Sequence, residues 1–188
     1  MSALTISPEE VKRVKGLGFL NNKGTDNFSA RVLTVNGKIT AAQHRCLAEA
    51  AELFGNGIIT FTTRLSVEVQ GIPFDKIEDF RNYIAKEGLQ TGGTGAKIRP
   101  IVSCKGTTCQ YGRLDSFKIS EEMHHRFFEG YKGVALPHKF KMAVGGCPNN
   151  CMKPDLNDVG IIGQLVPIHD IEKCKGCKKC KIEQVCPM

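Results

Sequence analysis

Four cysteines fall into two separated pairs, Cys104 with Cys109 and Cys147 with Cys151. Thiolates are soft ligands, and a group of four suits an iron–sulfur cluster. The second pair, in the sequence CPNNC, is predicted at the start of a helix, where both sulfurs share one face and the helix dipole lowers their pKa. The first pair is predicted in a loop that enters a helix. A zinc site, or cysteines without a ligand, is the alternative interpretation.

Basic residues flank these cysteines. Lys139 and Lys141 are two apart on a predicted strand, so both project to one side, where they favour a small oxyanion. Taken alone, such a pair is more often a solvated strand face. Arg64 follows a threonine-rich strand end, Arg99 follows a glycine-rich loop, and His138 adjoins the lysines as a candidate proton donor. A redox centre near an anion site predicts a reductase that acts on an oxyanion.

The last cysteines form a separate group with the spacing C-x2-C-x2-C-x5-C, at Cys174, Cys177, Cys180 and Cys186. This spacing is close to that of bacterial ferredoxins, although the last gap is longer. We expect iron–sulfur binding. Either these four residues hold one cluster, or they begin a module that is incomplete in this sequence; the second interpretation is favoured.

Composition narrows the class of protein. The chain has 188 residues, nine cysteines and a formal net charge of +7. Eight cysteines occur in short-spaced groups, which favours metal over disulfides, and Cys46 is expected to be a buried core thiol. No signal peptide and no membrane-spanning run is recognised, so a cytoplasmic protein is expected. The basic residues are dispersed, and nucleic-acid binding is not expected.

Periodicity predicts the elements that position these residues. Helices are expected at 8–16, 40–54, 74–86 and 108–131, and strands at 28–35, 58–63, 65–70, 98–103, 139–144 and 158–167. Thr40 and Gln43 form a capping-box pattern, and Gly55 is the expected end of this helix. The order β-α-β-β-α-β up to residue 103 is that of a ferredoxin-like unit. The predicted fold class is α+β, a ferredoxin-like unit followed by a mixed sheet with helices.

A composition change near residue 166 marks the start of the tail, and with the predicted elements it divides the chain into four segments. They are an N-terminal extension (1–25), a ferredoxin-like half-domain (26–96), a cluster-binding domain (97–166) and the start of a ferredoxin-type module (167–188).

Together these motifs resemble the siroheme-dependent sulfite and nitrite reductase family over about residues 26–166. The resemblance is carried by Thr62-Thr63-Arg64, Arg99, the KxK at 139–141 and the sequence GCPNNC. The first pair is spaced C-x4-C, where the family commonly has C-x5-C. The tail is similar to the ferredoxin module of dissimilatory and anaerobic-type members.

The resemblance implies a role for each residue. The first four cysteines would ligate a [4Fe–4S] cluster, and Cys151 would also bridge to the siroheme iron. The residues expected to bind sulfite or nitrite are Arg64, Arg99, Lys139 and Lys141. The residues expected to anchor siroheme are Arg31, Gly92, Gly93, Gly95 and the backbone near Asn149. The tail cysteines would hold an additional [4Fe–4S] cluster.

The implied reaction is a six-electron reduction of sulfite to sulfide or nitrite to ammonia, with electrons from a ferredoxin-like donor. Larger members contain two repeats, and the cysteines of one face the arginines and lysines of the other. This chain has each set once, so a homodimer or a related subunit is expected. The alternatives are a non-catalytic electron-transfer iron–sulfur protein on the same fold and a siroheme carrier without turnover.

Overall fold

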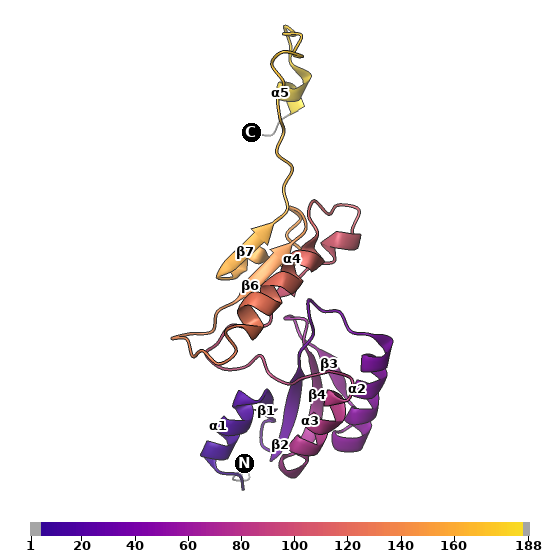
Figure 1. Cartoon of the computed structure of the whole chain (residues 1–188), viewed down its shortest axis with the longest axis vertical. Coiled ribbons are helices and arrows are strands. Elements are labelled where there is room, and N and C mark those ends of the chain that lie inside the picture. The colour runs from indigo at the N-terminus through magenta and orange to yellow at the C-terminus, as the bar shows by residue number, and fades with distance from the viewer. Residues whose placement is uncertain (1–4, 186–188) are drawn as a thin grey trace.

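The computed structural model describes residues 5–185 and consists of two α+β parts followed by an extended tail (Figure 1). The predicted α+β fold class is confirmed. The first part holds a four-stranded antiparallel sheet and the second a three-stranded parallel sheet. Cys186 lies outside the described residues.

The first sheet has the strand order β1-β2-β4-β3. Its strands are β1 (Phe19–Asn21), β2 (Asn27–Val32), β3 (Ile59–Phe61) and β4 (Val67–Pro73). Its helices are α1 (Pro8–Gly16), α2 (Ala41–Phe54) and α3 (Ile77–Ala85), with a 3-10 turn at Phe74–Lys76. The strand predicted at 98–103 is not part of this sheet. The edge place beside β2 belongs to β1, a strand that the sequence analysis did not predict.

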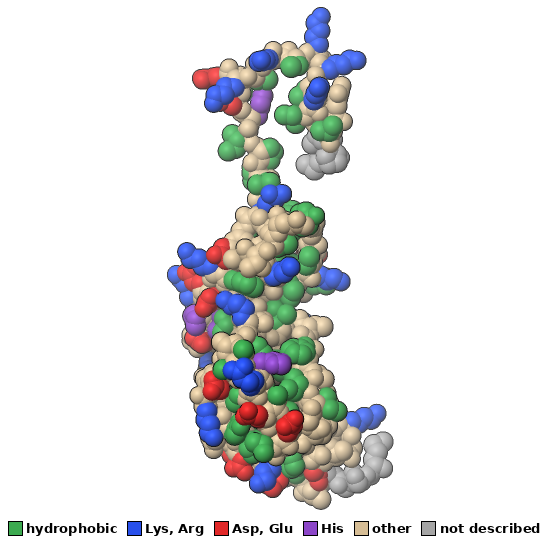
Figure 2. All heavy atoms as spheres, turned by 90° about the vertical axis from the view of Figure 1, so that its right-hand side faces the viewer, with side chains coloured by type: hydrophobic (Ala, Val, Ile, Leu, Met, Phe, Trp, Pro, Cys, Tyr) green, Lys and Arg blue, Asp and Glu red, His purple; other side chains and the backbone are tan. Residues whose placement is uncertain are grey.

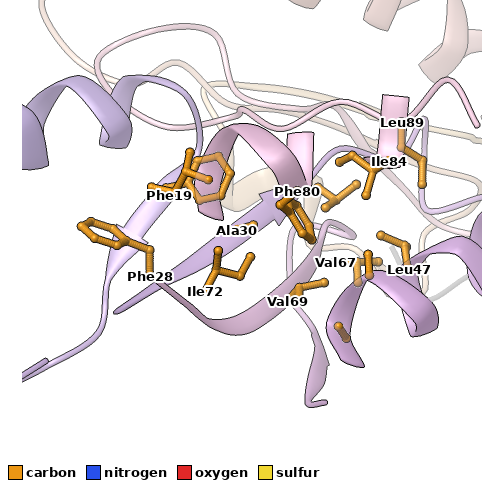
Figure 3. Packing of buried hydrophobic residues seen from close by; sticks show 14 of the residues in the cluster. Phe19, Phe28, Ala30, Leu47, Val67, Val69, Ile72, Phe80, Ile84 and Leu89 are labelled. Carbon is orange, nitrogen blue, oxygen red and sulfur yellow. The ribbon is translucent and has the colours of Figure 1, made fainter. Parts of the chain in front are cut away.

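The core of this part forms because β2 alternates: Phe28, Ala30 and Val32 are buried and their neighbours are not. Helices α2 and α3 pack against the same face, as Figure 3 shows for Leu47, Phe80 and Ile84 beside the strands. Phe19 and Phe80 meet edge to face, with ring centroids 6.0 Å apart, an arrangement that aromatic pairs prefer.

Helix α2 begins and ends where the sequence predicts. The Thr40 side chain accepts from the Gln43 N–H at 3.1 Å, and the Gln43 side chain accepts from the Thr40 N–H at 2.9 Å. This reciprocal capping box satisfies two backbone donors that the first helical turn leaves unpaired. Gly55 closes the other end.

The second sheet has the order β5-β6-β7. Its strands are β5 (Val102–Ser103), β6 (Met142–Gly145) and β7 (Val159–Ile162), and short 3-10 turns lie at Gly106–Thr108 and Pro154–Leu156. The helix predicted at 108–131 begins only at α4 (Ser116–Met123) and continues as a π-helix, His124–Glu129. Within this π-helix Phe128 is buried, whereas its neighbour Phe127 is 39% exposed.

The tail from residue 164 leaves the body and ends in α5 (Lys181–Val185) (Figure 1). Every described tail residue is exposed, including large apolar side chains such as Ile168 at 93% and Val166 at 80%. Figure 2 shows lysines and hydrophobic side chains on this thin extension. Within residues 5–185, no helix is long and apolar enough to cross a membrane.

Candidate metal centre and basic cluster

The parallel sheet brings the two cysteine loops to the same edge. Strands β5 and β6 pair in parallel, with Ser103 opposite Val144. Cys104 directly follows β5, and Cys147 follows β6 by two residues. Because the carboxyl ends of parallel neighbours lie at one edge of a sheet, both loops start side by side.

Two glycines let these loops approach closely. A Cβ on Gly106 would stand 2.7 Å from the Gly146 Cα, and a Cβ on Gly146 would stand 2.7 Å from the Gly106 Cα. Either methyl group would also come within 3.3 Å of the Cys104 sulfur. Only glycine fits at this crossing, so Gly106 and Gly146 set the separation of the cysteine pairs.

All four cysteines line one cavity of about 480 Å³. Its other walls include Tyr111 and Phe117 from the same part of the chain. Among residues 5–185, no three histidine, cysteine or acidic side chains converge closely enough to hold a single metal ion. A cubane cluster carries its irons at four corners, so its ligands come from around a cavity. The donor set, four thiols on one hollow, fits such a cluster.

One of the cysteine sulfurs in this cavity accepts a hydrogen bond from the backbone. The Gly146 N–H donates to the Cys104 sulfur at 3.0 Å, while the Cys104 N–H donates to the Val144 carbonyl at 3.1 Å. Hydrogen bonds to cysteine sulfurs are one of the ways in which proteins set the potential of an iron–sulfur cluster.

The helix predicted at CPNNC does not form. Residues 147–152 are bends and turns, and Asn150 has a left-handed backbone with φ of 56°. The pair Cys147 and Cys151 therefore faces the cavity because of turn geometry. The helix dipole predicted at these two thiols is therefore absent.

Arg64 joins the two parts of the molecule. Its Nη2 donates to the Pro100 carbonyl at 2.8 Å and lies 3.4 Å from the Met142 carbonyl, and its Nη1 donates to Asn157 Oδ1 at 3.2 Å. Burial lowers the pKa of the Arg64 guanidinium from its ordinary value, and the positive charge of Arg99 lowers it further.

Arg99 lies close enough to Arg64 and Arg31 for their charges to interact. Its Nη1 donates to the Gly93 carbonyl, and burial followed by the charge of Arg31 lowers its pKa. The Nε atoms of Arg64 and Arg99 are buried and have no hydrogen-bond partner among the described residues. Arg31 is paired with Glu68, its Nε 2.9 Å from Oε1. This cluster of three arginines fits an anionic group.

The lysine pair stands at the amino end of the same sheet. Lys139 is exposed and Lys141 is half-buried, with its backbone N–H donating to Asp158. Arg64, Arg99 and both lysines are absent from the walls of the cysteine cavity. Pro100 precedes Cys104 by four residues, about 13 Å of extended chain. Within one chain, the cysteines and the basic residues therefore occupy opposite ends of the strands.

The residues predicted to anchor siroheme are divided between two places. Asn149 and Cys151 line the cysteine cavity. Gly92 and Gly93 line a second cavity of about 320 Å³, together with the basic side chains of Arg81, Lys97 and Lys132. Gly95 lines neither of these two cavities. The tail cysteines Cys174, Cys177 and Cys180 are exposed and lie away from both.

Sequence reasoning missed several contributors to the cysteine cavity, among them Gly106, Gly146 and Asn36. The two glycines lie within two residues of a cysteine, a signal that could have been read as close backbone approach. Asn36 lies in the turn between Val35 and Lys38. It lines the cavity and is 3% exposed, a role that depends on packing between the two parts.

Comparison with protein families decides where this chain belongs. The sequence model described as "Nitrite/Sulfite reductase ferredoxin-like half domain" matches residues 21–87, and "Nitrite and sulphite reductase 4Fe-4S domain" matches residues 94–171. The chain belongs to the nitrite and sulfite reductase family. The two matches follow one another along the chain, the first over the antiparallel sheet and the second over the parallel sheet.

Relatives within the nitrite and sulfite reductase family are longer. An uncharacterized protein of Methanocaldococcus jannaschii is 33% identical over 156 residues, which cover 83% of this chain and 55% of that protein. The coenzyme F420-dependent sulfite reductase of the same organism is 35% identical over 126 residues, 66% of this chain and 20% of the relative. The chain thus spans about half of one relative and a fifth of the other.

A solved structure agrees on the fold. The Mycobacterium tuberculosis NirA protein superposes with a TM-score of 0.67 at 20% identity, covering 82% of this chain and 32% of that one.

Proposed function

We propose that this chain is a siroheme and [4Fe–4S] oxidoreductase that reduces sulfite to sulfide or nitrite to ammonia with six electrons. The main support is the single cavity lined by Cys104, Cys109, Cys147 and Cys151, which come from two loops more than thirty residues apart. Membership of the nitrite and sulfite reductase family supports the same chemistry.

In this proposal the polypeptide supplies ligands, charge and orientation. When bound, the siroheme and cluster would supply the electrons and an open iron for the substrate. The four thiolates would hold the cluster, and the buried Nε–H groups of Arg64 and Arg99 would be free to donate to an anion. Lys139 and Lys141 would neutralise the oxyanion and deliver protons from their ammonium groups.

We further propose that a complete site takes its cysteines from one chain and its basic residues from another. The support is the separation within one chain: the cysteines lie at the carboxyl ends of β5 and β6, whereas Arg64 contacts the carbonyls at their amino ends. A two-fold partner, a second copy or a related subunit, would bring the two sets together.

Mixing two inactive variants tests this shared site. A Cys151→Ser chain and a Lys141→Ala chain would form mixed dimers in which one site carries both lesions and the other carries none. Recovered sulfite or nitrite reductase activity is the expected result. Inactive preparations in which mixed dimers are confirmed by mass would exclude shared sites.

The first test of the proposed function is an anaerobic visible spectrum of the purified protein, followed by acid–acetone extraction. A Soret band with a long-wavelength chlorin-type band, extractable as siroheme, is expected. Only a broad iron–sulfur absorption that persists after reconstitution with siroheme would contradict the proposal.

A second candidate is an electron-transfer iron–sulfur protein without siroheme. The observation that favours it is the position of the basic residues away from the cysteine cavity. The two candidates differ for Lys139→Ala and Lys141→Ala. An electron carrier would keep its redox behaviour in both variants, whereas a reductase would lose turnover and anion binding.

A further inference from the structure

All four non-glycine residues with a left-handed backbone in the described chain lie at or near the cysteine cavity. Asn150 and Lys153 belong to the loop around the second cysteine pair, with φ of 56° and 47°. Asn36 and Leu65 belong to the ferredoxin-like half-domain, with φ of 50° and 60°, and both line the cavity. Such backbone conformations persist only where the surrounding structure enforces them.

The two residues of the half-domain belong to one hydrogen-bonded unit. The Thr34 hydroxyl donates to the Leu65 carbonyl, and it accepts from the Gly37 N–H at 3.2 Å. Gly37 has φ of 80°, and a Cβ there would stand 3.1 Å from the Leu65 Cδ1. The turn at residues 36–38 and the turn before Leu65 are therefore packed together.

This unit also contacts the domain that carries the cysteines. Asn36 Nδ2 donates to the Phe117 carbonyl at 3.2 Å. The Lys38 ammonium lies 4.9 Å from the centre of the Phe117 ring and 3.9 Å from Glu121 Oε2. Asn36, Lys38, Leu65 and Phe117 all line the cysteine cavity, so the half-domain supplies part of its wall.

We propose that this unit, residues 36–38 with Leu65, closes the cluster cavity against solvent and holds the positive charge of Lys38 beside it. The inference rests on the proposed cluster at the four cysteines. Exclusion of water would slow the loss of iron, and a nearby cation would favour the extra electron of the reduced cluster. The wall would make cluster stability and potential depend on the half-domain, although all its ligands lie in the other part.

The test starts from the 188-residue chain reconstituted anaerobically with iron and sulfide. Leu65→Ala opens the wall, and Leu53→Ala is the matched control because Leu53 is 64% exposed on α2. We expect EDTA to extract iron several-fold faster from Leu65→Ala than from the wild type, and at the wild-type rate from Leu53→Ala. Equal rates in the two variants would overturn the proposal.

A second pair of variants avoids the core. Lys38→Gln and Lys86→Gln remove the same charge, and each lysine lies over an aromatic ring, Lys86 at 4.7 Å from the Tyr83 centroid. We expect Lys38→Gln to shift the midpoint potential of the cluster to more negative values in an EPR-monitored titration. Lys86 does not line the cavity, so Lys86→Gln should leave the midpoint potential of the cluster unchanged. An equal potential in both variants would also overturn the proposal.

Measurements on the apo-protein distinguish a failure of the proposed function from a failure of the proposed cavity wall. If the wild type assembles no cluster, the proposed function fails. The wall is then tested by iodoacetamide, which should alkylate Cys104 and Cys109 several-fold faster in apo Leu65→Ala than in apo Leu53→Ala. Equal alkylation rates would overturn the wall independently of any cluster.

Discussion

At the scale of single residues, the cysteine cavity depends on Gly106 and Gly146 as much as on the cysteines. A side chain at Gly106 would meet the Gly146 Cα at 2.7 Å and the Ser116 Oγ at 2.9 Å. Ser116 in turn donates to the Cys104 carbonyl at 2.8 Å, so it cannot move away without loosening the cysteine loop. Small changes here should therefore alter the spacing between the ligands.

Gly106→Ala should separate the two cysteine loops. We expect a loss of about 1–3 kcal/mol in the free energy of unfolding, typical of overpacking, and reduced iron content after reconstitution. Urea denaturation and iron analysis measure the two effects. Gly133→Ala is the control, because a Cβ at Gly133 meets nothing within 4 Å. Wild-type iron content in Gly106→Ala would contradict the role of this crossing.

At the scale of elements, the π-helix after α4 holds two neighbouring histidines in opposite environments. His124 is 3% exposed, stacks on Phe128 with ring centroids 4.8 Å apart, and its Nδ1 has no partner in the described chain. Burial lowers the pKa of His124. His125 is exposed, and its hydrogen bond with Glu129 at 2.7 Å raises its pKa.

These shifts predict opposite effects of the two histidines on stability in acid. The folded state binds fewer protons at His124 than the unfolded state, so His124 costs stability as the pH falls through its ordinary pKa of 6.5. His125 binds protons more tightly when folded and adds stability over the same window, an effect lost as the pH rises through its raised pKa. Relative to wild type, His124→Asn should lose less stability on acidification and His125→Asn more. Urea denaturation on both sides of the ordinary histidine pKa measures this; the same change in both variants would contradict it.

At the scale of the whole molecule, Arg64 is the main polar joint between the half-domain and the parallel sheet. Its guanidinium reaches two backbone carbonyls and Asn157 in the other part. The loop that contains Arg64 continues into Leu65, which lines the cysteine cavity. One turn thus serves both the interface and the candidate metal centre.

Arg64→Gln should leave the Pro100 and Met142 carbonyls without their donor. We expect a loss of about 1–3 kcal/mol in the free energy of unfolding, because partly buried acceptors lose a charged partner. Arg45→Gln, at an exposed position on α2, should change it by less than about 0.5 kcal/mol. Chemical denaturation of both variants measures the difference, and equal stabilities would contradict the role of Arg64 as a joint.

For the tail we expect the opposite of Arg64→Gln: its removal should change the iron content of the protein but not its free energy of unfolding. Its described residues are exposed, so removal of residues 167–188 should change the free energy of unfolding by less than about 0.5 kcal/mol. If Cys174, Cys177 and Cys180 hold iron, the shortened chain should contain less of it after reconstitution. Calorimetry and iron analysis test both parts; equal iron content would contradict a cluster in the tail.

The sequence by itself determined the features that depend on local chemistry. The capping box at Thr40 and the burial of Cys46 follow from side-chain type and local sequence, and both are confirmed. The short spacing of Cys104 from Cys109, and of Cys147 from Cys151, indicated the candidate metal centre. The predicted family of the chain is confirmed. Each of these signals comes from residues that are close together in the sequence.

Tertiary structure decided what depends on long-range packing. Only the sheet shows that β1 takes the edge position, since its three residues are too short for a periodic signal. Only the fold shows that Asn36 and Leu65 line a cavity whose cysteines are tens of residues away. It also separates Arg64 from the cysteines along β5 and β6, because parallel strands carry their two ends to opposite edges of the sheet.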